Sequence, residues 1–166
     1  MDFRLVPVAA PIMLLDLLMT PLGQLDETAS LTSAVLIALC SDSLAAPDDQ
    51  LPDPNSDDRR GWWADENANA IWGGWDLGSR LWLLKRSSIT DSGARQGATI
   101  TRVQQYISNA MQPFVDAKIC SQFTVTARQT SSQSISACVT IYRGPKASIA
   151  LNFQALWSEL QANIGT

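Results

Sequence analysis

The residues that most resemble a chemical site lie in an acidic loop near the middle of the chain. Asp53, Asn55 and Asp57 carry oxygen atoms at alternate positions, which matches the first three ligand positions of a calcium-binding EF-hand loop. An EF-hand then needs a glycine for its turn and a bidentate glutamate at its end, where this chain has Asp58 and Ala64. We therefore expect a solvated acidic loop that binds no metal and no other cofactor.

Carboxylates among tryptophans form a second candidate site. Five of the six tryptophans lie in residues 61–86, and they are Trp62, Trp63, Trp72, Trp75 and Trp82. Asp65, Glu66 and Asp76 lie among them, and glycoside hydrolysis uses two carboxylates at a set separation, but no spacing here selects a pair. Clustered tryptophans more often fill a core or an interface. Packing is the favoured interpretation, with a cell-wall hydrolase and an aromatic-lined carbohydrate-binding module as alternatives.

Two arginines, Arg59 and Arg60, directly precede the first two tryptophans. Two guanidinium groups could clamp a phosphate or a carboxylate. The simpler expectation is that they pair with Asp57, Asp58 or Asp65 of the same loop, or stack on a tryptophan. A contact with a partner chain is the second expectation.

The chain lacks residues on which many catalytic and nucleic-acid sites depend. It has no histidine, which removes Ser-His-Asp and Cys-His catalysis and the commonest transition-metal ligand. Cys40, Cys120 and Cys138 form no CxxC pair and lie in apolar stretches, so we expect reduced core thiols, with one disulfide as the alternative. A net charge of −4 and no basic run longer than two residues argue against nucleic acid and anionic membranes as partners.

Hydrophobic periodicity gives the elements that must hold these residues. Near the N-terminus we expect an edge strand at 3–8 and a second apolar segment at 12–19 that packs on the core. Pro7, Pro11 and Asp16 interrupt this stretch, which is too short to span a bilayer. We therefore expect neither a membrane span nor a secretory signal peptide.

Two segments have the spacing of an amphipathic helix. Apolar residues recur on one helical face in residues 31–39 and again in Ala98–Asp116. Pro113 lies inside the second pattern and should kink or end that helix near Gln112. Between the helices, prolines and aspartates predict a loop at 46–60.

An antiparallel hairpin should follow the second helix. Residues 123–128 and 135–142 alternate between apolar and polar, and a polar connector separates them at 129–133. We expect the apolar face of the second strand to pack on the long helix. Its other face carries Ser136 and Thr140, which suits a sheet with one solvated side.

The order of several motifs resembles the phage Mu-type wedge proteins of contractile-tail baseplates. The most specific are Asp58-Arg-Arg-Gly-Trp-Trp63 and Gly78-Ser-Arg-Leu-Trp-Leu-Leu-Lys-Arg86. Weaker matches are Asp2-Phe-Arg-Leu5, Ser33-Ala-Val-Leu-Ile-Ala-Leu39 with Asp42, Asp49-x-Leu51-Pro52-Asp53, and Val139-Thr-Ile-Tyr-Arg143. The resemblance covers nearly the whole chain to about Arg143.

This resemblance implies an α+β fold, in which a small mixed or antiparallel sheet with a C-terminal hairpin packs against two to three helices. We expect one sheath-initiator-like wedge domain at 1–143, with the 46–60 loop inside it, and a C-terminal extension at 144–166.

The implied function is structural, and no enzymatic activity is expected. Such a protein would join the baseplate wedge of a contractile tail and template the first sheath ring. It would be made in the host cytoplasm and lie in the virion tail baseplate, within a sixfold-symmetric assembly. The implied partners are the large baseplate wedge protein and the tail sheath protein, with hub, spike or tube proteins as further candidates.

The same resemblance suggests where partners bind. The broader family of sheath initiators, once labelled lysozyme-like, carries Glu-Pro-Arg at the end of its long helix, where this chain has Asp116-Ala117-Lys118. The charge order is kept, although lysine cannot make the planar bidentate contacts of arginine. We expect Asp116 and Lys118 to contact the large wedge protein.

We also expect a sheath arm to add to the strand at 134–143 by β-augmentation, unless the N-terminal strand or the tail after Gly144 covers that edge. The full set of expected interface residues is Asp116, Lys118, Arg59, Arg60, Trp62, Trp63, Ser136, Thr140 and Tyr142.

Overall fold

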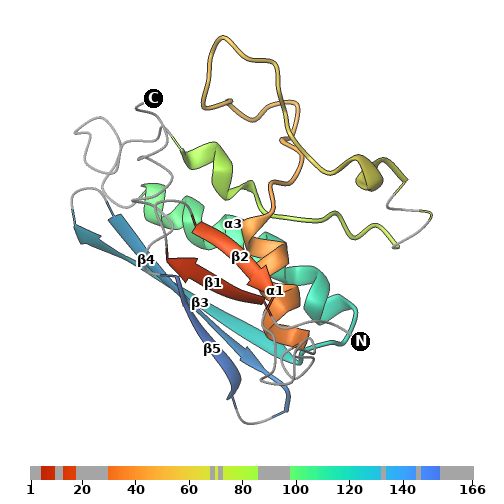
Figure 1. Ribbon diagram of the computed structural model, residues 1–166, viewed down its shortest axis with the longest axis vertical. Helices are drawn as coiled ribbons and strands as arrows, with labels where there is room; N and C mark the ends of the chain where they lie inside the picture. Colours follow the sequence, from red (N-terminus) through yellow and green to blue (C-terminus); the bar gives the residue numbers. More distant parts are fainter. Residues whose placement is uncertain are drawn as a thin grey trace.

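The computed structural model of the chain describes residues 5–9, 13–17, 30–67, 70, 73–85, 98–131, 134–144 and 147–153. Its elements are β1 (Leu5–Ala9), β2 (Met13–Leu17), α1 (Ser30–Cys40), the 3-10 helices η1 (Trp63–Asn67) and η2 (Arg80–Leu84), α3 (Ala98–Asp116), β3 (Gln122–Ser131), β4 (Ser134–Tyr142) and β5 (Ala147–Phe153). Helices and strands occupy separate parts of the chain, and an antiparallel sheet packs against helices (Figure 1). The predicted α+β class is confirmed.

The main sheet has three antiparallel strands in the order β3-β4-β5. In the predicted hairpin, Val125 faces Val139, and pairing continues as far as Ser131 and Ser134. The connector is therefore shorter than the polar segment 129–133, because polar residues on an exposed strand still complete the backbone ladder.

The third strand, β5, lies beyond Gly144 and pairs with β4 on the side opposite β3. Val139 on β4 faces Leu151 on β5. The strand at 134–143 is thus the central strand of the sheet and has no free edge. Of the expected alternatives, the structure shows the one in which the tail after Gly144 covers that edge. The extension expected to begin at residue 144 contributes a strand to the sheet.

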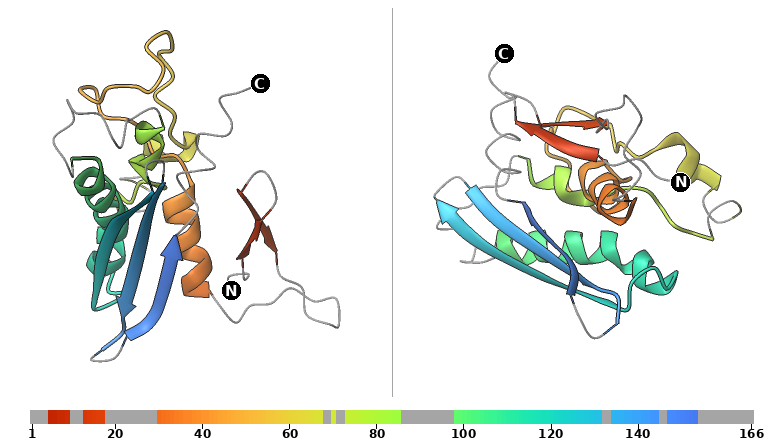
Figure 2. Two further views of the ribbon diagram at one scale, coloured as in Figure 1. Left: turned by 90° about the vertical axis from the view of Figure 1, so that its left-hand side faces the viewer. Right: turned by 60° about the horizontal axis from the view of Figure 1, so that its bottom comes forward.

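Helix α3 packs on one face of this sheet, and α1 and η2 pack against α3 (Figures 1 and 2). One apolar cluster joins all of these elements. The buried side chains of α3 that were predicted to face the hairpin are Val103, Ile107, Ala110 and Phe114, and those of β4 are Ile135, Val139 and Ile141. The predicted packing of helix on hairpin is confirmed.

Of the two outcomes expected at Pro113, a kink or an end of the long helix near Gln112, the end is wrong, because α3 continues to Asp116 with Pro113 inside it. A proline removes one backbone N–H donor. Here the neighbouring Met111 and Phe114 are fully buried, and the carbonyl of Pro113 still accepts a 2.9 Å hydrogen bond from the N–H of Ala117. Core packing therefore holds the helix together across the proline.

The two N-terminal strands pair with each other in a separate antiparallel hairpin that contacts α1. The edge strand expected at 3–8 is present as β1, but its partner is β2 and not the main sheet. Pro7 is tolerated because a strand in a two-stranded hairpin has one unpaired side. Among the described residues, no helix combines the length and apolar character that crossing a bilayer requires.

Candidate interaction surface

The connection between α1 and α3 holds the two most specific sequence motifs, and its loop at 46–60 extends away from the sheet in Figures 1 and 2. Backbone hydrogen bonds join the start of this connection to Ser79, the residue before η2, and we call this pairing the clamp. The N–H of Ser79 donates to the carbonyl of Ser41 at 2.9 Å, and the N–H of Ser43 donates to the carbonyl of Ser79 at 3.1 Å. Inside the protein, the Ser79 hydroxyl donates to the carbonyl of Leu39 at 2.8 Å, and Nε1 of Trp82 donates to the carbonyl of Ser43 at 2.8 Å.

This clamp explains the glycine before Ser79. Gly78 has φ of +102°, and a Cβ atom there would lie 2.7 Å from the carbonyl oxygen of Ser41 and 2.8 Å from the nitrogen of Ser43. No other residue fits such a close approach. Ser79 stands at the N-cap position of η2, but its side chain makes no capping bond because its hydroxyl is bound to Leu39.

Arg59 closes the neck of the acidic loop. Its carbonyl accepts a 3.0 Å hydrogen bond from the N–H of Ala45. Its guanidinium group binds the carbonyl oxygens of Ala46 and of Pro47, the latter at 3.1 Å. Arg59 is thus engaged inside the chain, as first expected although with other partners, and its contact with a partner chain stays a prediction.

Arg60 is also engaged within the chain. Its guanidinium group forms an ion pair with Asp42 and lies 4.8 Å from the ring centroid of Trp82. The expected stacking on a tryptophan is confirmed, whereas the expected ion pairs with Asp57, Asp58 or Asp65 are wrong. The carboxylate of Asp58 instead accepts the backbone N–H of Arg60 at 2.8 Å, and Arg60 itself adopts a left-handed φ of 54°.

Two of the carboxylates that suggested chemistry, Asp65 and Asp53, accept hydrogen bonds from backbone N–H groups. Both oxygens of Asp65 accept the N–H of Leu77, at 3.2 and 3.1 Å, which ties η1 to the segment before η2. Asp53 accepts the N–H of Asn55 at 3.0 Å in a local turn. Among the described residues, no group of three or more His, Cys, Asp or Glu side chains could hold a metal ion.

The tryptophans separate into two classes. Trp82 is 4% exposed, and Trp75 packs edge-on against Phe114 with ring centroids 4.9 Å apart. Trp62 and Trp63, in contrast, are 39% and 82% exposed. Within the chain, packing therefore accounts for Trp82 but not for Trp63, and Trp72 lies outside the described residues.

We define the tryptophan surface as Leu44, Trp62 and Trp63, and include Leu44 because it lies against Gly61, the residue before Trp62. Leu44 is 56% exposed, and the two indole centroids lie 5.7 Å apart. Gly61, with φ of +96°, lies directly on Leu44, since a Cβ at Gly61 would be 3.0 Å from the Leu44 Cβ. Leu44 was missed from the sequence because it is one apolar residue in a mostly polar stretch.

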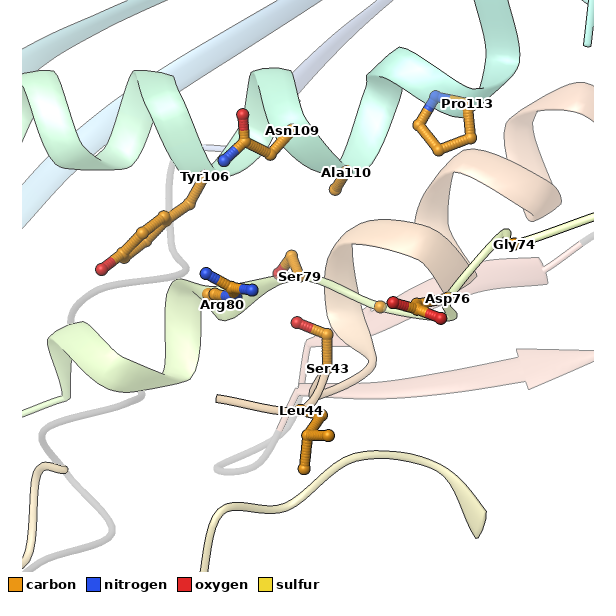
Figure 3. Close-up of a pocket in the computed structure, with 11 residues that line it drawn as sticks. Ser43, Leu44, Gly74, Asp76, Ser79, Arg80, Tyr106, Asn109, Ala110 and Pro113 are labelled. Carbon is orange, nitrogen blue, oxygen red and sulfur yellow. The ribbon is translucent and has the colours of Figure 1, made fainter. Parts of the chain in front are cut away.

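A pocket of about 190 Å³ lies between α3 and the segment before η2 (Figure 3). Tyr106, Asn109 and Pro113 of α3 form one wall, with Asp76 and Arg80 on the facing segment. The Arg80 guanidinium is 3.5 Å from the carboxylate of Asp49. Asp76 is the single carboxylate among the lining residues, so the pocket gathers no carboxylate pair of the kind a glycosidase uses.

Asp116 and Lys118 lie at the exposed end of α3. Lys118 adopts φ of 57°; its N–H binds the carbonyl of Val115 at 2.9 Å, and the N–H of Ile119 binds that of Phe114 at 2.9 Å. This pattern is a Schellman motif, with lysine at the left-handed position that glycine usually occupies. Asp116 accepts a 2.9 Å hydrogen bond from Gln112. Both charges face solvent close together, while a role in partner binding stays a prediction.

The remaining expected interface residues lie on the central strand β4. Ser136 is buried, and Thr140 and Tyr142 are partly buried. The carbonyl of Tyr142 accepts both the N–H and the hydroxyl of Ser121, at 2.8 and 2.9 Å. Tyr142 is therefore bound to the segment that directly follows the charged end of α3.

All three cysteines are free thiols, with Cys120 buried and Cys40 and Cys138 partly buried. Burial raises the pKa of Cys120, and the charge of Arg143 partly offsets that rise. Burial, with a smaller contribution from Asp42, raises the pKa of Cys40 to about 11. Thiols with raised pKa values are poor nucleophiles at neutral pH.

A family model described as "Phage protein GP46" matches residues 31–148. The baseplate protein gp46 of Escherichia phage Mu is 39% identical over 100 residues, which cover 60% of this chain and 61% of that protein. The match thus spans about three fifths of the relative's length. No solved structure matches the chain significantly.

Proposed function

The chain belongs to the phage protein GP46 family, and from this membership we propose that it is a structural component of a phage tail baseplate. The observation that carries the proposal is the 39% identity to the baseplate protein of phage Mu. The geometry supports it, because Arg60 of one specific motif packs on Trp82 of the other, and this arrangement leaves Trp62 and Trp63 exposed.

In finer detail, we propose that the protein is a wedge component of a contractile tail that joins the wedge and templates the first sheath ring. Its partners would be the large wedge protein and the sheath protein, with hub, spike or tube proteins as further contacts, in a sixfold-symmetric assembly. The support is the order of the motifs, including Asp58-Arg-Arg-Gly-Trp-Trp63. The proposed unit is the domain at 1–143, to whose sheet β5 of the extension adds a strand.

The outer strands β3 and β5 are the proposed sites for a sheath arm. Strand β4 is paired on both sides, but β3 and β5 each have one side that no other described strand covers. Unpaired backbone N–H and C=O groups on such a side can accept an additional strand. Strand β3 is ten residues long, which gives an arm a continuous ladder to extend.

The test is removal of this chain from the phage. Particles made without it should lack assembled sheath on their baseplates, and expression of the protein in trans should restore sheathed tails. Mass spectrometry of purified wild-type baseplates should find the chain. Normally sheathed tails without the protein would overturn the proposal.

The hydrolase alternative has its own test. Purified protein is applied to a peptidoglycan zymogram beside lysozyme. The structural proposal expects no clearing. A cleared zone that disappears in Asp65→Ala or Asp76→Ala would establish a hydrolase instead.

A further inference from the structure

The tryptophan surface is large, exposed and firmly held. Trp63 is 82% exposed at the start of η1, although a tryptophan side chain is among the most apolar surfaces a protein can offer. The backbone on both sides of it is fixed: Arg60 is paired with Asp42, and Asp65 is bound to the N–H of Leu77. A partner that binds these rings would therefore order little additional backbone, which favours affinity.

We call residues 42–66, the segment that carries this surface, its acidic rim, and the net charge of this segment differs in sign from that of the rest of the chain. Residues 42–66 hold eight carboxylates and two arginines, a net charge of −6. The chain as a whole has a net charge of −4, because the other residues hold ten cations against eight carboxylates. The two arginines, Arg59 and Arg60, are engaged with Ala46, Pro47, Asp42 and Trp82, so they add no free cation to the rim.

We propose that the tryptophan surface docks into an apolar groove edged by lysine and arginine side chains on another protein chain of the particle. The inference rests on the proposed baseplate function and names the chemistry of the partner. Charge complementarity selects this occupant, because an acidic rim repels a second copy of the same surface, an anionic lipid and a nucleic acid. Exposed paired aromatic rings are typical of residues that dominate binding energy at interfaces.

The experiment measures binding of the full chain to the tagged large wedge protein of the same phage, with the tagged sheath protein as a second probe. Trp63→Ala should weaken binding to one of them about thirtyfold or more, as expected when an interface tryptophan is truncated. The control is Gln105→Ala, because Gln105 is exposed on α3 and lies outside the tryptophan surface. It should leave the affinity unchanged. Trp63 is so exposed that its truncation should not unfold the chain, which circular dichroism checks.

A second arm tests the charge. Asp48, Asp57 and Glu66 are exposed acidic residues of segment 42–66 that are not part of its clamps. The triple variant Asp48→Asn/Asp57→Asn/Glu66→Gln should weaken binding at low ionic strength and make the affinity less dependent on salt. Tighter binding by the triple variant would mean that the groove is edged by acids, which overturns the proposal.

The outcomes separate this inference from the function on which it rests. If the wild-type chain binds a probe and Trp63→Ala binds equally well, the docking inference fails while the baseplate proposal stands. If the wild-type chain binds neither probe, the docking inference fails, while the baseplate proposal is decided separately by the assembly of particles made without this chain. Concentration-dependent self-association that Trp63→Ala abolishes, seen by analytical ultracentrifugation, would assign the surface to a second copy and overturn the inference. So would binding of peptidoglycan fragments that requires Trp63.

Discussion

Nε1 of Trp82 lies 2.8 Å from the carbonyl oxygen of Ser43, to which it donates a buried hydrogen bond. Together with the bonds of Ser79, this bond links the Gly78-Ser-Arg-Leu-Trp-Leu-Leu motif to the chain that leaves α1. The same indole ring supports the guanidinium of Arg60 on its face. Trp82 therefore holds together the frame that positions the two exposed tryptophans.

Replacement of this indole tests the frame. Trp82→Phe keeps an aromatic ring but leaves the carbonyl of Ser43 buried without that donor, which should cost about 1–3 kcal/mol of unfolding free energy beyond the lost contacts. Trp75→Phe is the matched control, since Trp75 packs edge-on against Phe114. Urea denaturation should show the larger loss for Trp82→Phe. Equal losses would mean that the hydrogen bond contributes little.

The core prediction concerns Ile107, which is 2% exposed between α3 and the sheet. Ile107→Ala should lower the free energy of unfolding by roughly 2–5 kcal/mol, because it leaves a cavity in a packed core. Ile37→Ala, on the partly exposed side of α1, should cost clearly less. A loss under about 1 kcal/mol for Ile107→Ala would contradict its place in the core.

Local patterns predicted the helices and the hairpin, because periods of 3.6 and 2 follow directly from helix and strand geometry. The bounds Ala98–Asp116 and the buried set around Ile107 agree with that expectation. Pro113 was misjudged because its cost is local, whereas the packing of Met111 and Phe114 that offsets it comes from distant segments.

The sequence predicted most residues of the candidate surface, but not which of them contact each other or which are buried. Arg60 and Asp42 are eighteen residues apart, and no local pattern pairs them. Trp62, Trp63 and Trp82 have the same side chain, and only the fold decides that Trp82 is buried and Trp63 exposed. Sequence spacing carries no information on which ring the chain turns inward.

Lys118 offers a test that separates backbone strain from charge. Lys118→Gly should stabilise the protein by about 1 kcal/mol, because glycine adopts the left-handed φ without strain, while Lys118→Ala should bring no such gain.

If the charge of Lys118 binds the large wedge protein, both variants should weaken co-purification equally at low salt. Charge reversal at Asp116 should weaken it as well. Unchanged co-purification in these variants would remove both residues from the interface.

A pair of prolines tests the edge of β3. Along an antiparallel strand, N–H groups point alternately toward and away from the neighbour. One of Thr126→Pro and Ala127→Pro should therefore remove a bond to β4, and the other an outward N–H. The variant that stays folded should fail to support sheath assembly on baseplates if a sheath arm pairs with β3. Normal sheath growth on baseplates carrying that variant would exclude β3 as the template.

Cys40 should make stability depend on alkaline pH. Its pKa is raised from 9.0 to about 11, first by burial and then by Asp42. A raised pKa in the folded state gives a contribution that is fully present below pH 9 and is lost as pH rises toward 11. Wild-type protein should therefore lose more unfolding free energy than Cys40→Ala between pH 9 and pH 11. Parallel losses in urea denaturation would contradict this assignment.

The closed neck at Arg59 makes the acidic loop a place where foreign sequence can be inserted. The neck is fixed by the bond from Ala45 to Arg59 and by the guanidinium contacts with Ala46 and Pro47. None of these bonds involves the residues at the tip of the loop. Closing a loop of twice the length costs only about 0.6 kcal/mol more. An affinity tag or a fluorophore-binding peptide placed between Pro54 and Asn55 would give a handle for isolating and imaging the assembled particle.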